Sequence, residues 1–128
     1  MEDKQKLIQQ IVSSGRQVHA VLGPGFLESI YVRALVLELR NQGLSLERER
    51  KIKIWYGTQV VGTHRLDLIV DAAVIVEMKA NSGIVAVHLA QLRSYLQATA
   101  YPLGLILNFG RPDLEWELIE TTRGAETV

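Results

Sequence analysis

Hydrophobic residues recur at helical spacing in the first third of the chain. Leu7, Leu22 and the apolar residues between them return every three or four positions, which predicts an amphipathic helix over about 4–22. Gly23-Pro24-Gly25 ends this helix, because glycine and proline interrupt helical backbone. A second apolar stripe predicts a helix over about 27–41, which a glycine two residues further on would end.

The pattern then changes to alternation, which is typical of strands. Gly57-Thr58 predicts a turn, and Gly62 predicts a bulge in the strand that follows. A helix over 85–100 follows the third strand. The predicted strands are 46–56, 59–70, 73–79, 103–109 and 114–120. Because the third and fourth strands are joined through a helix, we expect them to be parallel, which predicts an α/β fold with a mixed sheet.

The second and third strands carry a group of charged residues. A three-residue loop over 71–73 would pair Val70 with Val74, so that Asp67 lies opposite Glu77. The same register places Arg65 opposite Lys79 on that face. The other face would be wholly apolar, and its members are Leu66, Leu68, Val76 and Met78. A register slip of one residue is the alternative.

Two opposed carboxylates repel each other. They stay together if one is protonated, if a basic side chain intervenes, or if a cation lies between them. Mg²⁺ takes oxygen ligands, so Asp67 and Glu77 fit it, and Lys79 could orient an attacking water or stabilise negative charge on a phosphate. These are the components of phosphodiester hydrolysis. From the spacing alone, a solvated cross-strand charge cluster is an equally good interpretation.

Three motifs in order add a second line of evidence. G-x-x-E-x-x-Y spans 25–31, D-x9-E-x-K spans 67–79, and H-x-x-Q-L-x-x-Y spans 88–95. Together they resemble the GxxExxY family, a group of short prokaryotic proteins in the PD-(D/E)XK nuclease superfamily. The resemblance runs from about His19 to Gly110.

The resemblance implies a restriction-endonuclease-like mixed sheet flanked by helices. It implies Mg²⁺- or Mn²⁺-dependent cleavage of a nucleic acid, with DNA favoured. The implied metal ligands are Asp67, Glu77 and Glu28, the implied catalytic lysine is Lys79, and the implied supporting pair is Gln91 and Tyr95. The superfamily often has proline before the first aspartate, where this chain has Leu66. A nuclease-fold binding or regulatory module without cleavage activity is the alternative function.

Other polar residues have simpler interpretations. Tyr31 shares a helix face with Glu28, and we expect it to pack rather than to act on substrate. For His88, a hydrogen-bonding neighbour is favoured over a metal ligand, because Mg²⁺ sites are rich in oxygen. His19 is expected to be structural, near the Gly-Pro-Gly turn.

The predicted first strand is basic and aromatic. Its cations, Arg48, Arg50, Lys51 and Lys53, favour a charged edge strand that resists aggregation, with phosphate contacts as the alternative. Trp55 and Tyr56 are expected to pack, with base stacking as the alternative.

Composition bears on how the protein could bind nucleic acid and on where it is located. The 14 basic and 14 acidic residues cancel, which argues against gripping nucleic acid by bulk charge alone. The chain has no cysteine, so disulfides are excluded. We expect a cytoplasmic protein, because the N-terminus lacks the apolar run of a signal peptide. We expect one domain over 1–120 and a flexible tail over 121–128, and leave open whether the protein is a homodimer.

Overall fold

The computed structural model describes residues 2–121. The helices are α1 (Glu2–Leu22), α2 (Glu28–Asn41) and α3 (Ala86–Ala98). The strands are β1 (Leu46–Tyr56), β2 (Gln59–Val70), β3 (Val74–Lys79), β4 (Leu103–Asn108) and β5 (Glu115–Glu120). Each lies within about two residues of its predicted bounds, the usual uncertainty at element ends. Apart from Thr121, the predicted tail lies outside the described residues.

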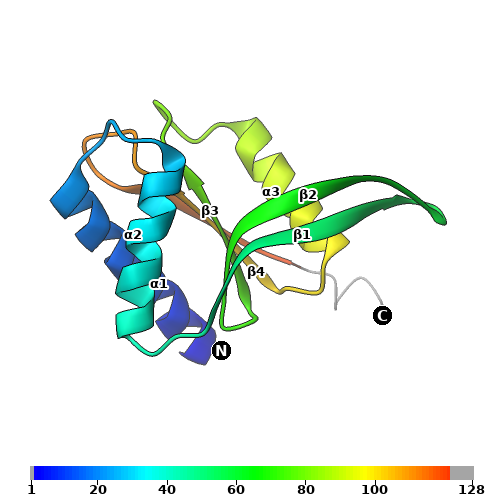
Figure 1. Cartoon of the computed structure of the whole chain (residues 1–128), viewed down its shortest axis with the longest axis horizontal. Helices are drawn as coiled ribbons and strands as arrows, with labels where there is room; N and C mark the ends of the chain where they lie inside the picture. The colour runs from blue at the N-terminus through cyan, green and yellow to red at the C-terminus, as the bar shows by residue number, and fades with distance from the viewer. Residues whose placement is uncertain (1, 122–128) are drawn as a thin grey trace.

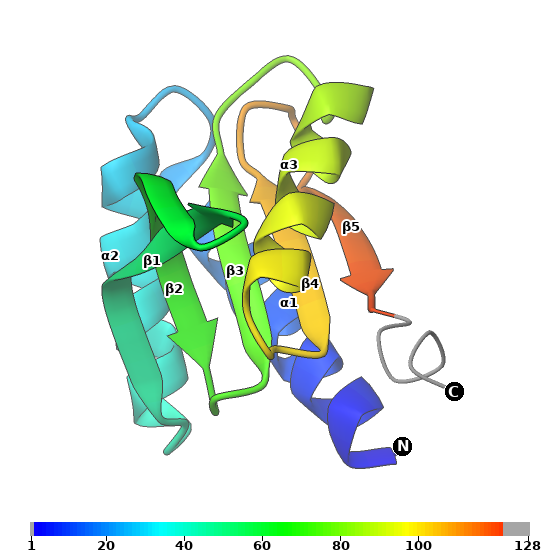
Figure 2. The same ribbon diagram turned by 90° about the vertical axis from the view of Figure 1, so that its right-hand side faces the viewer.

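The five strands form one mixed sheet in the order β1-β2-β3-β4-β5. β3 and β4 are parallel, as predicted, and every other neighbouring pair is antiparallel. Helices α1 and α2 cover one face of the sheet and α3 covers the other (Figures 1 and 2). Within residues 2–121, no helix is long and apolar enough to cross a membrane.

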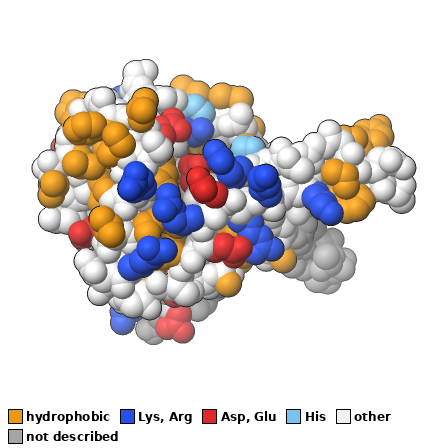
Figure 3. All heavy atoms as spheres, in the orientation of Figure 1, with side chains coloured by type: hydrophobic (Ala, Val, Ile, Leu, Met, Phe, Trp, Pro, Cys, Tyr) orange, Lys and Arg blue, Asp and Glu red, His pale blue; other side chains and the backbone are white. Residues whose placement is uncertain are grey.

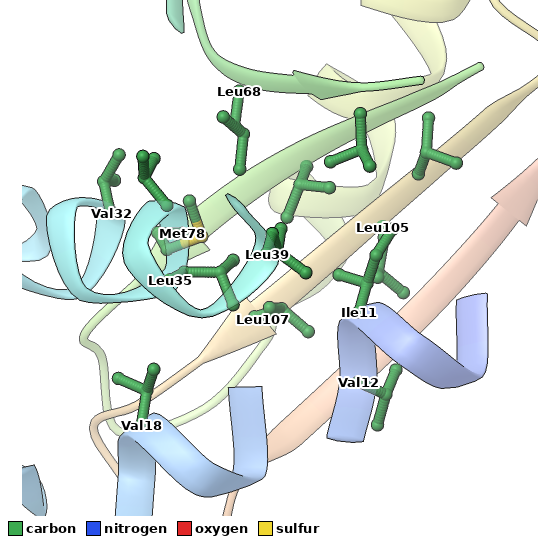
Figure 4. Close-up of a cluster of buried hydrophobic side chains, with 14 of the residues drawn as sticks. Ile11, Val12, Val18, Val32, Leu35, Leu39, Leu68, Met78, Leu105 and Leu107 are labelled. Carbon is green, nitrogen blue, oxygen red and sulfur yellow. The ribbon is translucent and has the colours of Figure 1, made fainter. Parts of the chain in front are cut away.

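The larger core lies between the sheet and helices α1 and α2. Figure 4 shows the helical residues of this core pointing toward the sheet. Its fully buried members include Ile11, Leu35, Leu39, Leu68, Met78, Leu105 and Leu107. A fully buried leucine contributes about 1.5–3 kcal/mol through removal of apolar area from water, so this face is the main source of stability.

A smaller core lies under α3. Leu92 and Leu96 of the helix pack with Ile75 and Ile106 of the central strands. A side chain on Gly104 of β4 would place its Cβ 2.8 Å from Leu92 Cγ. Helix α3 therefore approaches β4 this closely because residue 104 has no side chain.

The alternation of β2 breaks at Leu66–Asp67, and here one prediction is wrong. Leu68 lies in the core under α1 and α2, but Leu66 belongs to the core under α3, as Ile69 does. The pairing of β1 with β2 passes from Arg48↔Leu68 to the pair at Leu66 and omits the residues between. Glu49, the residue omitted on β1, has a φ of 53°, which turns the strand out of its regular pleat. A second irregularity leaves Val61 unpaired, next to the predicted bulge.

Candidate active site

Asp67 and Glu77 lie together where the pairing of β2 and β3 ends. The predicted register is confirmed by the pairs Val70↔Val74 and Leu68↔Val76, beyond which no further backbone pair is formed between these strands in the described chain. Instead, the amide of Met78 donates to Asp67 Oδ2 at 2.9 Å, and the amide of Asp67 donates to Glu77 Oε2 at 3.0 Å. Each carboxylate thus replaces a ladder hydrogen bond, which fixes its orientation across the two strands.

The two carboxyl groups of this pair destabilise each other when both are charged. Glu77 is 7% exposed, and its pKa is raised to about 8, first by burial and then by the charge of Asp67. Burial also raises the pKa of Asp67, while the Met78 amide and the charge of Lys79 oppose that rise. At neutral pH Glu77 therefore keeps its proton unless a cation compensates the pair. The donors are oxygen atoms, which fit Mg²⁺ or Mn²⁺.

Lys79 ends β3 beside the two carboxyl groups. Its charge lowers the pKa of both Glu77 and Asp67, so the three groups share one site. The carbonyl of Lys79 accepts from the amide of Phe109 at 2.8 Å, which ties this end of β3 to the chain after β4. The predicted pair of Lys79 with Arg65 is not among the backbone pairs of β2 and β3.

The loop after Lys79 is held by Asn108, which sequence reasoning missed. The Asn108 side chain is fully buried, accepts from the amide of Asn81 at 2.9 Å and donates to the Asn81 carbonyl at 3.1 Å. It also donates to Glu115 Oε1 at 2.9 Å, and that oxygen accepts from the amide of Ile84 at 3.0 Å. The sequence signal was a single polar residue at the end of an otherwise apolar strand.

Glu28 begins α2 and is exposed. Its charge contributes to the raised pKa of Glu77, so it lies within electrostatic reach of the pair. Among residues 2–121, however, no three His, Cys, Asp or Glu side chains are close enough to form a metal cluster. The described chain therefore assembles the pair of Asp67 and Glu77, and Glu28 stands apart from it.

Tyr31 is fully buried, as the packing interpretation expected. Its hydroxyl donates to the carbonyl of Gly23 at 2.6 Å and accepts from the amide of Phe26 at 3.1 Å. Its ring stacks on Phe109 with centroids 4.4 Å apart, and His19 stacks more loosely on Phe109 at 6.1 Å. Tyr31 thus fixes the loop that leads into α2 and sets where Glu28 lies.

The three predicted residues on α3 have different surroundings. His88 accepts from the amide of Val85 at 3.1 Å, and its other ring nitrogen lies 3.3 Å from Asn81 Nδ2, so it caps the helix and contacts the loop after Lys79. Gln91 is exposed, and within residues 2–121 its side chain makes no hydrogen bond. Tyr95 is half-buried, and its pKa is raised by burial and then by the charges of the two acids.

His64 is a neighbour of the site that sequence reasoning missed. Its ring stacks on Tyr95 with centroids 4.0 Å apart, and its Nε2 atom is buried with no hydrogen-bond partner in the described chain. Burial lowers the pKa of His64, the charge of Asp67 opposes this, and the charge of Lys79 adds to it. Regular alternation puts residues 64 and 67 on opposite faces, so only the break at Leu66–Asp67 brings them together.

The fold and this site define a class of protein. A family model described as the PD-(D/E)XK nuclease superfamily matches residues 5–120. The chain belongs to the PD-(D/E)XK nuclease superfamily, and its five-stranded mixed sheet with flanking helices is consistent with the restriction-endonuclease-like fold. Members are generally nucleases that use divalent metals. No curated protein and no solved structure matches the chain. The narrower resemblance to the GxxExxY family stays a prediction.

Proposed function

We propose that this protein is a divalent-metal-dependent nuclease that hydrolyses phosphodiester bonds, with DNA as the favoured substrate. The observation that carries the proposal is the buried acid pair, Asp67 and Glu77, with Lys79 beside it. A protein gains no stability from burying two carboxyl groups that repel each other, so the arrangement calls for a compensating ligand. Membership of a nuclease superfamily supports hydrolysis as its purpose.

Asp67 and Glu77 would hold Mg²⁺ or Mn²⁺, and Glu28, which stands apart from them, would contact the ion through a water. When bound, the cation would supply Lewis-acid polarisation of the phosphate and would lower the pKa of a coordinated water. The amide hydrogen bonds to both carboxylates keep their oxygens oriented before any ligand arrives. This preorganisation reduces the reorganisation needed during the reaction.

Lys79 would act on the reacting groups. Its ammonium group would orient the attacking water and stabilise negative charge that develops on the phosphate oxygens. The Asn108 contacts to the following loop restrict how far the end of β3 can move, which helps hold Lys79 in place. Because a small misplacement of a reacting group is costly to rate, Asn108 would be a positioning residue.

The residues of α3 would support this site from one side. The stacked rings of Tyr95 and His64 would limit access of water to the acid pair, and His88 would hold the start of the helix. Gln91 is free to reach a substrate phosphate from the exposed surface of α3. We therefore assign Gln91 to substrate contact.

A binding or regulatory module with the same fold is the second candidate. It is favoured by the lack of a three-carboxylate cluster within residues 2–121 and by the balanced charge. Such a module would keep the acid pair and its metal but would not cut nucleic acid by itself.

A cleavage assay with matched variants tests the proposal. Single-stranded DNA, duplex DNA and RNA are each incubated with Mg²⁺ or Mn²⁺. Glu77→Ala and Lys79→Ala should each lower the rate by about 10²–10³-fold, because each removes a charge that acts on the transition state. Glu117→Ala and Lys6→Ala remove exposed groups of the same types and should cut at the wild-type rate.

Calorimetric titration with Mn²⁺ separates the two candidates. If wild-type cleavage equals that of both site variants on every substrate, catalysis by this chain is ruled out. Mn²⁺ binding that is lost in Asp67→Asn, together with no cleavage, would then support the binding module. No binding by the wild type would remove the metal site as well.

A further inference from the structure

The hairpin of β1 and β2 extends beyond the rest of the sheet as an arm, defined here as residues 51–65 (Figures 1 and 3). Strand pairing continues to its last pair, Tyr56↔Gln59, and Gly57 turns the chain with a φ of 62°. Every residue from 55 to 63 is exposed. The outer arm thus stays paired on both sides of the irregularity at Val61, and the rest of the described chain leaves most of its surface uncovered.

The tip of the arm is apolar. Trp55 is 58% exposed and Tyr56 80%, while Val60 and Val61 are 44% and 63% exposed. Packing in the core, one of the two expectations for these aromatic residues, is therefore wrong for both, and Trp55 keeps only a partial contact at the edge. Trp55 lines a shallow pocket with Ser94 and Ala98 of α3, which leaves more than half of its surface exposed. Tyr56, one residue nearer the tip, is more exposed still. Clustered exposed apolar groups on a projection are typical of a binding surface.

The cations of the arm lie at its base, next to the rest of the sheet. Lys51 pairs directly with Arg65, and like charges opposite each other destabilise a sheet. Ile52 packs under α3, so alternation places Lys51 and Lys53 on the solvent side. Within residues 2–121 these two lysines form no ion pair, and Arg65 has only a 3.9 Å contact to the exposed Glu49. A polyanion would relieve this repulsion.

The cations lie between the tip of the arm and the acid pair. Arg65 lies two residues before Asp67 on β2. From Gln59 at the tip to Asp67 is eight residues, roughly 26 Å of strand. The two paired strands of the arm thus link the aromatic tip and the cations to the candidate site.

We propose that the arm binds an unpaired nucleic-acid strand beside the cleavage site. Its bases stack on Trp55 and Tyr56, and its phosphates contact Lys51, Lys53 and Arg65. An unpaired strand fits because its bases can present their faces to aromatic rings, which a duplex hides. Edge protection explains the cations but not the exposed tryptophan and tyrosine. The link to cleavage rests on the proposed nuclease function, whereas binding does not.

The test measures binding without divalent metal, so that metal-dependent cleavage cannot occur. The full chain is titrated with a fluorescently labelled oligonucleotide, single-stranded or duplex, in buffer containing EDTA, and anisotropy is recorded. Trp55→Ala with Tyr56→Ala should weaken single-strand binding about tenfold or more, because each stacked base contributes substantially. Lys51→Ser with Arg65→Ser should reduce the slope of log affinity against log salt by about 1.4. Trp116→Ala and Lys6→Ser, on other surfaces, are the matched controls.

Tryptophan fluorescence adds a direct readout, since Trp116→Phe leaves Trp55 as the only tryptophan. The single strand should quench Trp55. Unchanged affinity in the aromatic double variant, or binding of duplex as tight as of single strand, would overturn the proposal. A further outcome would also overturn it: the wild type is a dimer, and the aromatic double variant is a monomer with unchanged oligonucleotide affinity. The tip would then be a contact between two copies of the chain. Intact binding without cleavage in Mg²⁺ would instead count against the nuclease function alone.

Discussion

The two faces of the sheet differ in what they bury. On β3, Val76 and Met78 enter the large apolar core under α1 and α2, whereas Ile75 packs under α3. Strand alternation places Glu77 on the same face as Ile75. Two helices of 21 and 14 residues cover the first face, and one of 13 residues covers the second. The buried acid pair therefore lies on the more thinly covered face, where a ligand can reach it.

This difference separates stability from chemistry within one strand. Successive side chains of a strand point to opposite faces, so β3 can anchor the fold and carry the site at once. The first face is apolar, and the other face holds two carboxyl groups with raised pKa values. Truncating an apolar residue of the first face should therefore lower stability, whereas replacing Glu77 by a neutral residue should raise it.

The largest effect is expected on the apolar face. Leu35 of α2 is fully buried, and Leu35→Ala should lower the free energy of unfolding by about 2–5 kcal/mol through lost burial and a residual cavity. Urea denaturation measures this. Leu37→Ala, on the exposed side of the same helix, is the control and should change stability little. Equal losses for the two variants would show that this face does not hold the fold together.

The opposite sign is expected for Glu77→Gln. The Glu77 carboxyl titrates near 4.5 when unfolded and near pH 8 when folded, so the folded state keeps a proton that the unfolded state releases. The wild type should then lose stability as pH rises from about 4.5 to about 8 without divalent metal. Glu77→Gln stays neutral, so at about pH 8.5 it should be more stable than wild type by a few kcal/mol, and at about pH 4 nearly equal.

Urea denaturation in EDTA across this pH range gives the measurement. The exposed Glu117→Gln is the control and should follow the wild-type curve. Adding Mn²⁺ at about pH 8.5 should raise wild-type stability more than that of Glu77→Gln, because a ligand stabilises only the state that binds it. A wild-type curve that is flat between about pH 4.5 and 8 would mean that the pair is not strained.

Regular features of the molecule could be predicted from the sequence. Alternation and helical periodicity predict every helix and strand of the described chain. The short loop before Val74 predicts the register of β2 against β3. The charged pair of Asp67 and Glu77 followed from that register. These features depend on local patterns, which a single sequence contains.

Irregular features could not be predicted. The left-handed φ of Glu49 has no sequence signature, because glutamate rarely adopts it, yet it accompanies the break that moves Leu66 to the other face. The same break brings His64 toward Asp67. The exposure of Trp55 depends on how much of the β1–β2 arm α3 covers, which is a tertiary property. Periodicity alone assumes that strands stay regular and covered.

The smallest effect is expected in the loop that joins the two site strands. Asp71 and Ala72 both have a φ of 51°, a left-handed conformation that is unfavourable for alanine. The Asp71 carboxylate is used here, since its Oδ1 accepts from the amide of Ser45 at 2.9 Å. Ala72 has no such compensation. Ala72→Gly should therefore raise the free energy of unfolding by up to about 1 kcal/mol, after the entropy lost by glycine is subtracted.

Ala73→Gly is the matched control, because Ala73 is not among the residues with positive φ. It should destabilise the protein by about 0.5–1 kcal/mol. The loop lies at the end of β2 and β3 away from Asp67 and Glu77, so Mn²⁺ affinity should be the same in both variants and in wild type. Equal destabilisation by the two glycines would mean that residue 72 is not strained. A change in Mn²⁺ affinity would mean that the loop, and not only the amide bonds between the strands, sets the geometry of the acid pair.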